Sequence, residues 1–130
     1  MKGCYAGMKS YGKKVWLIPD AFYSSVSNGS QKSHESVCVI NTGKEDAKIR
    51  LTLLFEDREA MGGFTSECKS SRTHHIRMDK QVSESGKGVP QDVPYAILAE
   101  SDVPIVVQYS RLDTSQAEMA LMTTIAYTED

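Results

Sequence analysis

Short segments of alternating apolar and polar residues run along most of this chain, separated by turn-forming residues. The clearest segment covers residues 47–55, where every second residue from Ala47 to Phe55 is apolar and those between are mostly polar. Because successive side chains of a strand point to opposite faces, this spacing predicts a strand with one buried face. Such a strand is typical of an antiparallel sheet.

The same pattern rule, applied to the whole chain, predicts about eight strands and almost no helix. Only residues 115–120 would accept a helix, and that stretch is too short for more than a turn or two. Strands without helical crossovers between them indicate an all-β, antiparallel β-sandwich of the jelly-roll type. The expected strands cover residues 14–19, 35–41, 47–55, 64–68, 72–78, 95–100, 105–113 and 121–128.

The length of 130 residues suits a single domain with a substantial core. We expect this domain to cover residues 14–130, after an N-terminal extension of residues 1–13. The extension carries lysines but no continuous apolar run, so it resembles neither a signal peptide nor a membrane anchor. With 40% apolar and 25% charged residues the composition is ordinary for a globular protein. We therefore expect a cytoplasmic protein that does not insert into a membrane.

The charge of the chain argues against nucleic acid as a partner. A formal net charge of −2 at pH 7 leaves no broad basic surface. A basic patch would require an oligomer that gathers Lys13, Lys14, Lys48 and Arg50. Strongly salt-dependent binding would be its signature.

Histidines and cysteines do not have the spacing of a metal site. His74 and His75 are adjacent, so on a strand they point to opposite faces, and His34 is distant in sequence. The three cysteines, at positions 4, 38 and 68, form no CxxC motif, and their odd number argues against a closed disulfide framework. Nucleophile and phosphate-binding motifs are absent from the sequence as well. We expect no metal, no other cofactor and no enzymatic activity.

Two predicted strands carry the most informative patterns. The run from Val37 to Ile40 is continuously apolar, which predicts a strand covered on both faces. The segment 103–113 begins with Pro104, which suits the first residue of a strand, and ends in polar residues. Regular alternation puts Arg111 and Asp113 on the same face as Val107 and Tyr109, with Gln108 on the other. Arg111 and Asp113 therefore either pair with each other or contact one ligand.

Other candidate residues also have two interpretations. His34 and Glu35 stand between a long polar loop and an apolar strand, where they would be either simple edge polarity or groups exposed to a pocket. Trp16, the only tryptophan, is usually a core or subunit-interface residue in such a strand, and less often a stacking surface for a sugar or other ring.

Taken together, these residues resemble the Anabaena sensory rhodopsin transducer family, from about residue 16 to residue 127. The match follows the same order along the whole of that range. Its most specific parts are Ser33-His34-Glu35, residues 37–41, Glu45-Asp46-Ala47, Arg72-Thr73-His74-His75-Ile76-Arg77, residues 103–108, Arg111-Leu112-Asp113, Gln116-Ala117-Glu118 and Thr124-Ile125-Ala126-Tyr127.

The resemblance implies a β-sandwich that assembles as a homotetramer in the cytoplasm. The founding member relays signals from a membrane photoreceptor, and the wider family is associated with small-molecule binding, including carbohydrate-like ligands. We therefore expect a non-catalytic sensor domain that binds a small polar ligand, carbohydrate-like or anionic. The alternative is an oligomeric adaptor that relays a signal from a membrane receptor or to another protein. The expected ligand-binding residues are Trp16, His34, Glu35, Gln108, Arg111 and Asp113.

Overall fold

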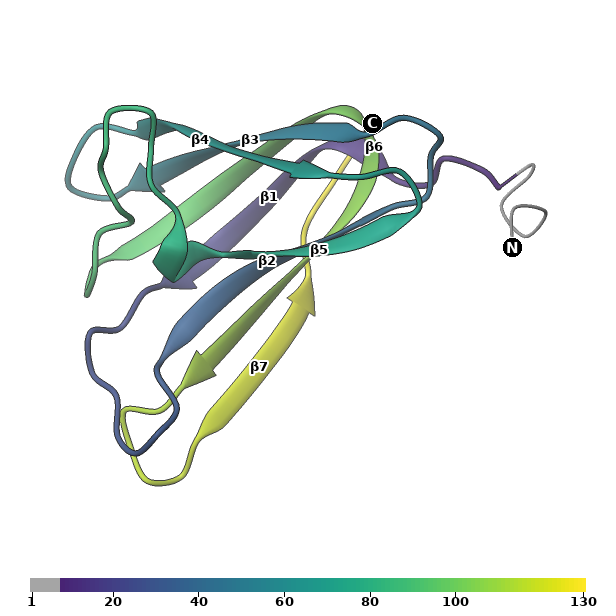
Figure 1. The fold of residues 1–130 in the computed structure, drawn as a ribbon. Coiled ribbons are helices and arrows are strands. Elements are labelled where there is room, and N and C mark those ends of the chain that lie inside the picture. Colours follow the sequence, from purple (N-terminus) through teal and green to yellow (C-terminus); the bar gives the residue numbers. More distant parts are fainter. Residues whose placement is uncertain (1–7) are drawn as a thin grey trace.

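The computed structural model describes residues 8–130, and these residues form seven antiparallel strands arranged in two facing layers (Figure 1). The expected all-β, antiparallel fold is confirmed. The one helical element in this part of the chain is a single 3-10 turn, η2. The strands are β1 (Lys13–Phe22), β2 (His34–Asn41), β3 (Ala47–Phe55), β4 (Met61–Cys68), β5 (Arg72–Arg77), β6 (Pro94–Asp113) and β7 (Ala120–Ile125), with η2 (Met78–Lys80) after β5.

The long strand β6 belongs to both layers. Residues 94–101 pair with β1 and β3, and β3 continues to β4. Residues 106–113 pair with β2 and β7, and β2 continues to β5. We call these layers sheet A (β1, β6, β3, β4) and sheet B (β7, β6, β2, β5). Figure 1 shows that β6 bends strongly between them, so its two ends lie on the side of the molecule away from the chain termini.

The bend in β6 explains why seven strands form instead of about eight. The predicted strands 95–100 and 105–113 are one continuous strand of 20 residues. Pro104 lies inside it and does not open it. The pairing with β3 ends at Ser101 and the pairing with β2 begins at Val106, so Pro104 lies where no ladder hydrogen bond is required. Of the stretch 115–120, which would accept a helix, residues 115–118 form bends and Ala120 is already the first residue of β7.

The core lies between the two sheets. In β3 the predicted alternation is observed, since Ile49, Leu51 and Leu53 are at most 1% exposed whereas Lys48 and Arg50 point to solvent. The same inner layer receives Val37 and Val39 from β2 and Ile105, Val107 and Tyr109 from β6. This apolar burial is the main driving force for the fold.

The prediction that β2 is covered on both faces is wrong for the described residues. Val37 and Val39 are buried, but Ile40 is 45% exposed. Within residues 8–130 no further layer covers the outer face of sheet B, so an apolar residue on that face stays exposed. The outer face also carries Leu121 and Ile125 of β7, which are 75% and 62% exposed.

Most of the predicted N-terminal extension, residues 1–7 with Cys4, lies outside the described residues. Residues 8–12 precede β1, and Lys13 is the first residue of that strand. Within residues 8–130, no helix has the length and apolar character needed to cross a membrane.

Candidate functional site at the ends of β6

A buried carboxylate occupies the space between the two ends of β6. Glu35 is 1% exposed because it shares the inner face of β2 with Val37. Its Oε2 accepts a hydrogen bond of 2.7 Å from the backbone N–H of Phe22 and another from the hydroxyl of Tyr109. Its Oε1 accepts a hydrogen bond of 2.6 Å from the hydroxyl of Tyr95. A buried carboxylate is costly unless it is hydrogen-bonded, and these three donors supply that compensation.

The two phenols act as permanent donors to Glu35. Burial, followed by the negative charge of Glu35 and the hydrogen bond to it, raises the pKa of both Tyr95 and Tyr109 above its usual value. Both hydroxyls therefore keep their protons at neutral pH, and Glu35 has donors on each of its oxygens.

Arg111 extends the network toward the surface. Its Nε donates a hydrogen bond of 3.0 Å to the hydroxyl of Tyr109, and its Nη2 donates one of 3.2 Å to the backbone carbonyl of Asp20. Burial opposes the charge, but the hydrogen bond to Tyr109 and the nearby carboxylates of Asp20 and Glu35 raise the pKa of Arg111. We call the set Asp20, Glu35, Tyr95, Tyr109 and Arg111 the Glu35 clasp.

The clasp joins the two sheets. Tyr95 lies in the half of β6 that belongs to sheet A, whereas Tyr109 and Arg111 lie in the half that belongs to sheet B. Through Glu35 the two halves of one strand are held together. Contacts to Phe22 and Asp20 add β1 to the same network.

Trp16 lies in the core, near the bend of β6. It is 5% exposed, and its single Nε1–H is shared in a bifurcated hydrogen bond, with Nε1 3.0 Å from the backbone carbonyl oxygens of both Ile105 and Lys13. This placement is the core alternative predicted for Trp16. It leaves no free ring face for stacking in this chain.

The remaining expected residues do not converge on the clasp. Gln108 is exposed on the outer face of sheet B, in register with Cys38 and Ile125. The His34 ring nitrogen Nδ1 lies 2.9 Å from the carbonyl oxygen of Lys32. Asp113 accepts a hydrogen bond of 2.8 Å from the backbone N–H of Ser115 and does not pair with Arg111. Of the six expected ligand residues, only Glu35 and Arg111 belong to one network.

Three residues of the clasp were not among the predicted site residues. Tyr109 could have been found from the sequence, because alternation places it on the same face of the strand as Arg111. Nothing local connects Tyr95 or Asp20 to Glu35, because their approach depends on the bend of β6 and on the pairing of β1 with it. For a metal, the part of the chain that the structure describes contains no cluster of three or more His, Cys, Asp or Glu side chains.

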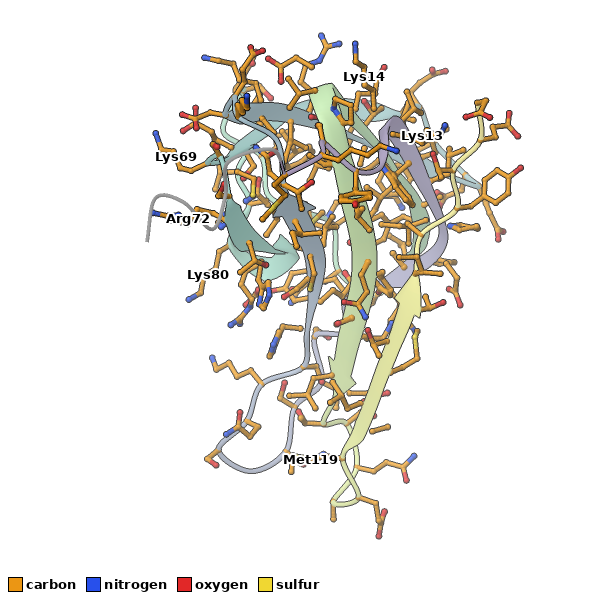
Figure 2. All side chains as sticks on the ribbon, turned by 90° about the vertical axis from the view of Figure 1, so that its right-hand side faces the viewer. Lys13, Lys14, Lys69, Arg72, Lys80 and Met119 are labelled. Carbon is orange, nitrogen blue, oxygen red and sulfur yellow. The ribbon has the colours of Figure 1, made fainter. Side chains whose placement is uncertain are left out.

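The basic residues in the described part of the chain do not form one patch. Figure 2 shows Lys13 and Lys14 on a different side of the molecule from Lys69, Arg72 and Lys80. The predicted patch is partly assembled within one chain, since Lys14, Lys48 and Arg50 surround a common cavity of about 450 Å³. Two acidic residues, Glu100 and Asp102, line the same cavity, so its charge is mixed.

Comparison with known proteins gives a consistent family. A family model described as Anabaena sensory rhodopsin transducer matches residues 11–128. The crystal structure of Thermotoga maritima 1070 has 43% sequence identity and a TM-score of 0.81, and the match covers 91% of this chain and 96% of that one. The structure of the Anabaena sensory rhodopsin transducer has 35% identity and a TM-score of 0.71, covering 85% and 96% respectively. No curated protein matches the chain.

Proposed function

The chain belongs to the Anabaena sensory rhodopsin transducer family, and on that premise we propose that it is a non-catalytic signal-relay protein. It works as a cytoplasmic homotetramer that passes a signal from a membrane receptor to another protein. The support for a receptor partner is the relative at 35% identity, which is named as a rhodopsin transducer.

The observation that carries the proposal is the outer face of sheet B. Ile40, Leu121 and Ile125 are 45%, 75% and 62% exposed on this face. The pairing registers place Ile40 beside Val106, Gln108 beside Ile125, and Leu112 beside Leu121, so the apolar residues span three neighbouring strands. Large apolar side chains exposed on neighbouring strands of one sheet face are a feature of protein contact surfaces, and here polar Gln108, Ser110 and Thr123 lie among them.

Strand β7 supports the same conclusion. It pairs with β6 on one side, every residue in it is exposed, and its sequence ALMTTI contains no charge and no proline. Edge strands of monomeric proteins usually carry charged residues or proline, which prevent pairing with another chain. By contrast, the edge strand β5 carries Arg72, His74, His75 and Arg77. An unprotected edge beside an apolar face favours assembly, and we propose a second copy of the chain as its first occupant.

The absence of catalysis is part of the proposal. The partners of Glu35 are two tyrosines and a backbone N–H, and none of them is a histidine that would pair with it as a general base. In the clasp the carboxylate is therefore a structural acceptor.

Light scattering on the purified protein tests the assembly. We expect the mass of four chains for the wild type, and a smaller species for the double variant Leu121→Lys, Ile125→Lys, because two charges on this face oppose burial. The control is Val82→Lys, since Val82 is 61% exposed and lies outside sheet B. A monomeric wild type, or an unchanged mass for the double variant, would contradict the assembly.

Photo-crosslinking tests the relay itself. A photoreactive residue at position 121 in the native host cell should yield crosslinks to a second copy, and the same residue at position 82 should not. Photoreactive residues at other exposed positions outside sheet B should yield crosslinks to a membrane receptor from at least one position. Crosslinks to further copies alone, with no receptor in any growth condition, would leave assembly standing and remove the relay.

A second candidate function is binding of a small polar ligand, carbohydrate-like or anionic, at Arg111. The Arg111 side chain is 24% exposed, and its contact with the Asp20 carboxylate is long, at 3.5 Å. Because the Asp20 side chain is 82% exposed, a ligand carboxylate or hydroxyl pair would displace it and bind the guanidinium directly.

Thermal denaturation with a library of sugars and sugar acids tests this candidate. A ligand at one hundred times its Kd stabilises the native state by about 2.7 kcal/mol. Asp20→Asn should strengthen binding by freeing Arg111, and Arg111→Lys should weaken it because bidentate contact is lost. The absence of a hit at millimolar concentration, or a hit unaffected by both variants, would reject the site.

A further inference from the structure

A cleft beside the Glu35 clasp has no role in the relay function. It has a volume of about 380 Å³, within the range of small-molecule sites. It lies where β1 and β3 pair with opposite sides of β6, with Phe22 in register with Pro94 and Phe55 in register with Tyr95. Its lining residues are Pro19, Asp20, Leu54, Phe55, Glu56, Pro94, Tyr95 and Ala96.

The floor of the cleft is aromatic and held in place. The ring centroids of Phe55 and Tyr95 are 6.2 Å apart, and the rings are tilted by 32°. Tyr95 is 3% exposed, and its hydroxyl is bonded to Glu35 at 2.6 Å. Because the clasp holds this hydroxyl, the ring stays in one position, which favours binding without loss of side-chain freedom.

The two charged residues that line the cleft are both acidic, and the guanidiniums of Arg58 and Arg111 contact lining residues from outside it. Its lining includes two carboxylates, Asp20 and Glu56, and none of the described lysines or arginines. Both side chains are exposed to solvent. Among the described residues Glu56 forms no salt bridge, and the Asp20 carboxylate forms only the long contact with Arg111.

Two residues of the cleft already contact cations of this chain. The guanidinium carbon of Arg58 lies 5.2 Å from the ring centroid of Phe55. The guanidinium of Arg111 contacts the backbone carbonyl and the carboxylate of Asp20. Aromatic faces and carboxylates are protein groups that bind organic cations. In this cleft Phe55 and Asp20 each already contact a guanidinium group of the chain itself.

We propose that this cleft binds a small organic cation, an alkylammonium or guanidinium group attached to an apolar body. The apolar part lies over Phe55 and Pro94, and the cationic group lies between Asp20 and Glu56. Such a site goes beyond the relay function and does not depend on the oligomeric state proposed for it.

Nuclear magnetic resonance with matched probes tests the charge requirement. We would titrate the ¹⁵N-labelled protein with phenethylamine, and separately with 2-phenylethanol, which has the same shape without the charge. Phenethylamine should shift the amide signals of Phe55, Glu56 and Ala96 in a saturable way, and 2-phenylethanol should bind about tenfold more weakly. Equal binding of both probes, or shifts confined to other residues, would overturn the proposal.

Conservative variants test the location. Glu56→Gln keeps the size of the side chain and should weaken phenethylamine binding several-fold, and Phe55→Leu should weaken it further by removing the ring. The control is Glu59→Gln, since Glu59 is exposed and does not line the cleft. The dispersion of the amide spectrum reports whether each variant is folded. Equal affinities for the Glu56→Gln and Glu59→Gln variants would reject the cleft as the binding site.

Discussion

Two regions of the sandwich, at opposite ends of β6's two halves, are stabilised by different kinds of interaction. Near the bend of β6, Trp16 fills the core and shares its one indole N–H between two backbone carbonyls. At the ends of β6, Glu35 gathers two phenols and a backbone N–H around one carboxylate. The Trp16 end depends on buried volume, and the Glu35 end depends on charge and complete hydrogen bonding. The two ends should therefore respond to different perturbations.

Trp16→Ala should have the largest effect. It removes a large buried side chain and leaves a cavity, which costs about 3–5 kcal/mol of unfolding free energy. Urea denaturation measures the change. Trp16→Phe, which keeps a ring but loses the donor, should cost about half as much. A loss below about 1 kcal/mol for Trp16→Ala would show that this end contributes little.

Glu35→Gln should have the next largest effect. The side chain keeps its volume, but its NH₂ group faces donors that previously had a carboxylate oxygen, at a cost of about 2 kcal/mol. Urea denaturation again measures it, with Glu45→Gln as control because Glu45 is an exposed turn residue. If Glu35→Gln and Glu45→Gln were equally stable, the hydrogen bonds to the buried Glu35 carboxylate would not be what stabilises that end of the sandwich.

Alkaline pH should destabilise the Glu35 end selectively. The pKa of Tyr95 and of Tyr109 is raised in the folded protein above the usual value of 10.0. Above that pH the unfolded chain releases phenolic protons that the native state retains. The stabilisation of the native state that comes from the two raised pKa values is therefore complete below pH 10 and is lost as the pH rises above it. Each phenol adds a loss of about 1.4 kcal/mol per pH unit.

Denaturation curves at several alkaline pH values measure this slope. Tyr109→Phe should remove about half of the clasp's contribution to it, whereas Trp16→Phe should leave it unchanged. If Trp16→Phe changed the slope as much as Tyr109→Phe does, the two ends would be coupled and the comparison would fail.

Asp20→Asn should have the smallest effect. The Asp20 side chain is 82% exposed and its carboxylate lies 3.5 Å from Arg111, so the pair contributes about 0.5 kcal/mol or less. Urea denaturation of the variant at low and high salt measures it. A loss above about 1.5 kcal/mol would place Asp20 among the structural members of the clasp, with Glu35 and its tyrosines.

Local patterns were sufficient to predict most of the strands. The alternation in β3 predicted its buried face, because burial on one side of a sheet selects apolar residues at every second position. The same rule placed Tyr109 and Arg111 on one face of β6. It failed for β2, since a continuous apolar run does not reveal whether a second layer covers both faces. In this protein the outer face of β2 stays exposed.

The candidate site was harder to predict than the strands. Glu35 and Arg111 were selected from the sequence, and the structure brings them into one network through Tyr109. Trp16 and Gln108 were selected with them, but Trp16 lies in the core and Gln108 on the outer face of sheet B. Residue types alone do not report which side of a sheet, or which end of a strand, a side chain occupies.

The all-β composition, the position of most strands and the family follow from the sequence alone, because alternation and the order of short motifs can be followed along the chain without any tertiary contact. Which polar groups meet depends on the tertiary structure. Tyr95 and Tyr109 reach the same carboxylate because β6 bends between two sheets and pairs with different strands on each side of the bend. That convergence depends on contacts between distant segments, and these contacts also form the cleft at Phe55 and leave the outer face of sheet B uncovered.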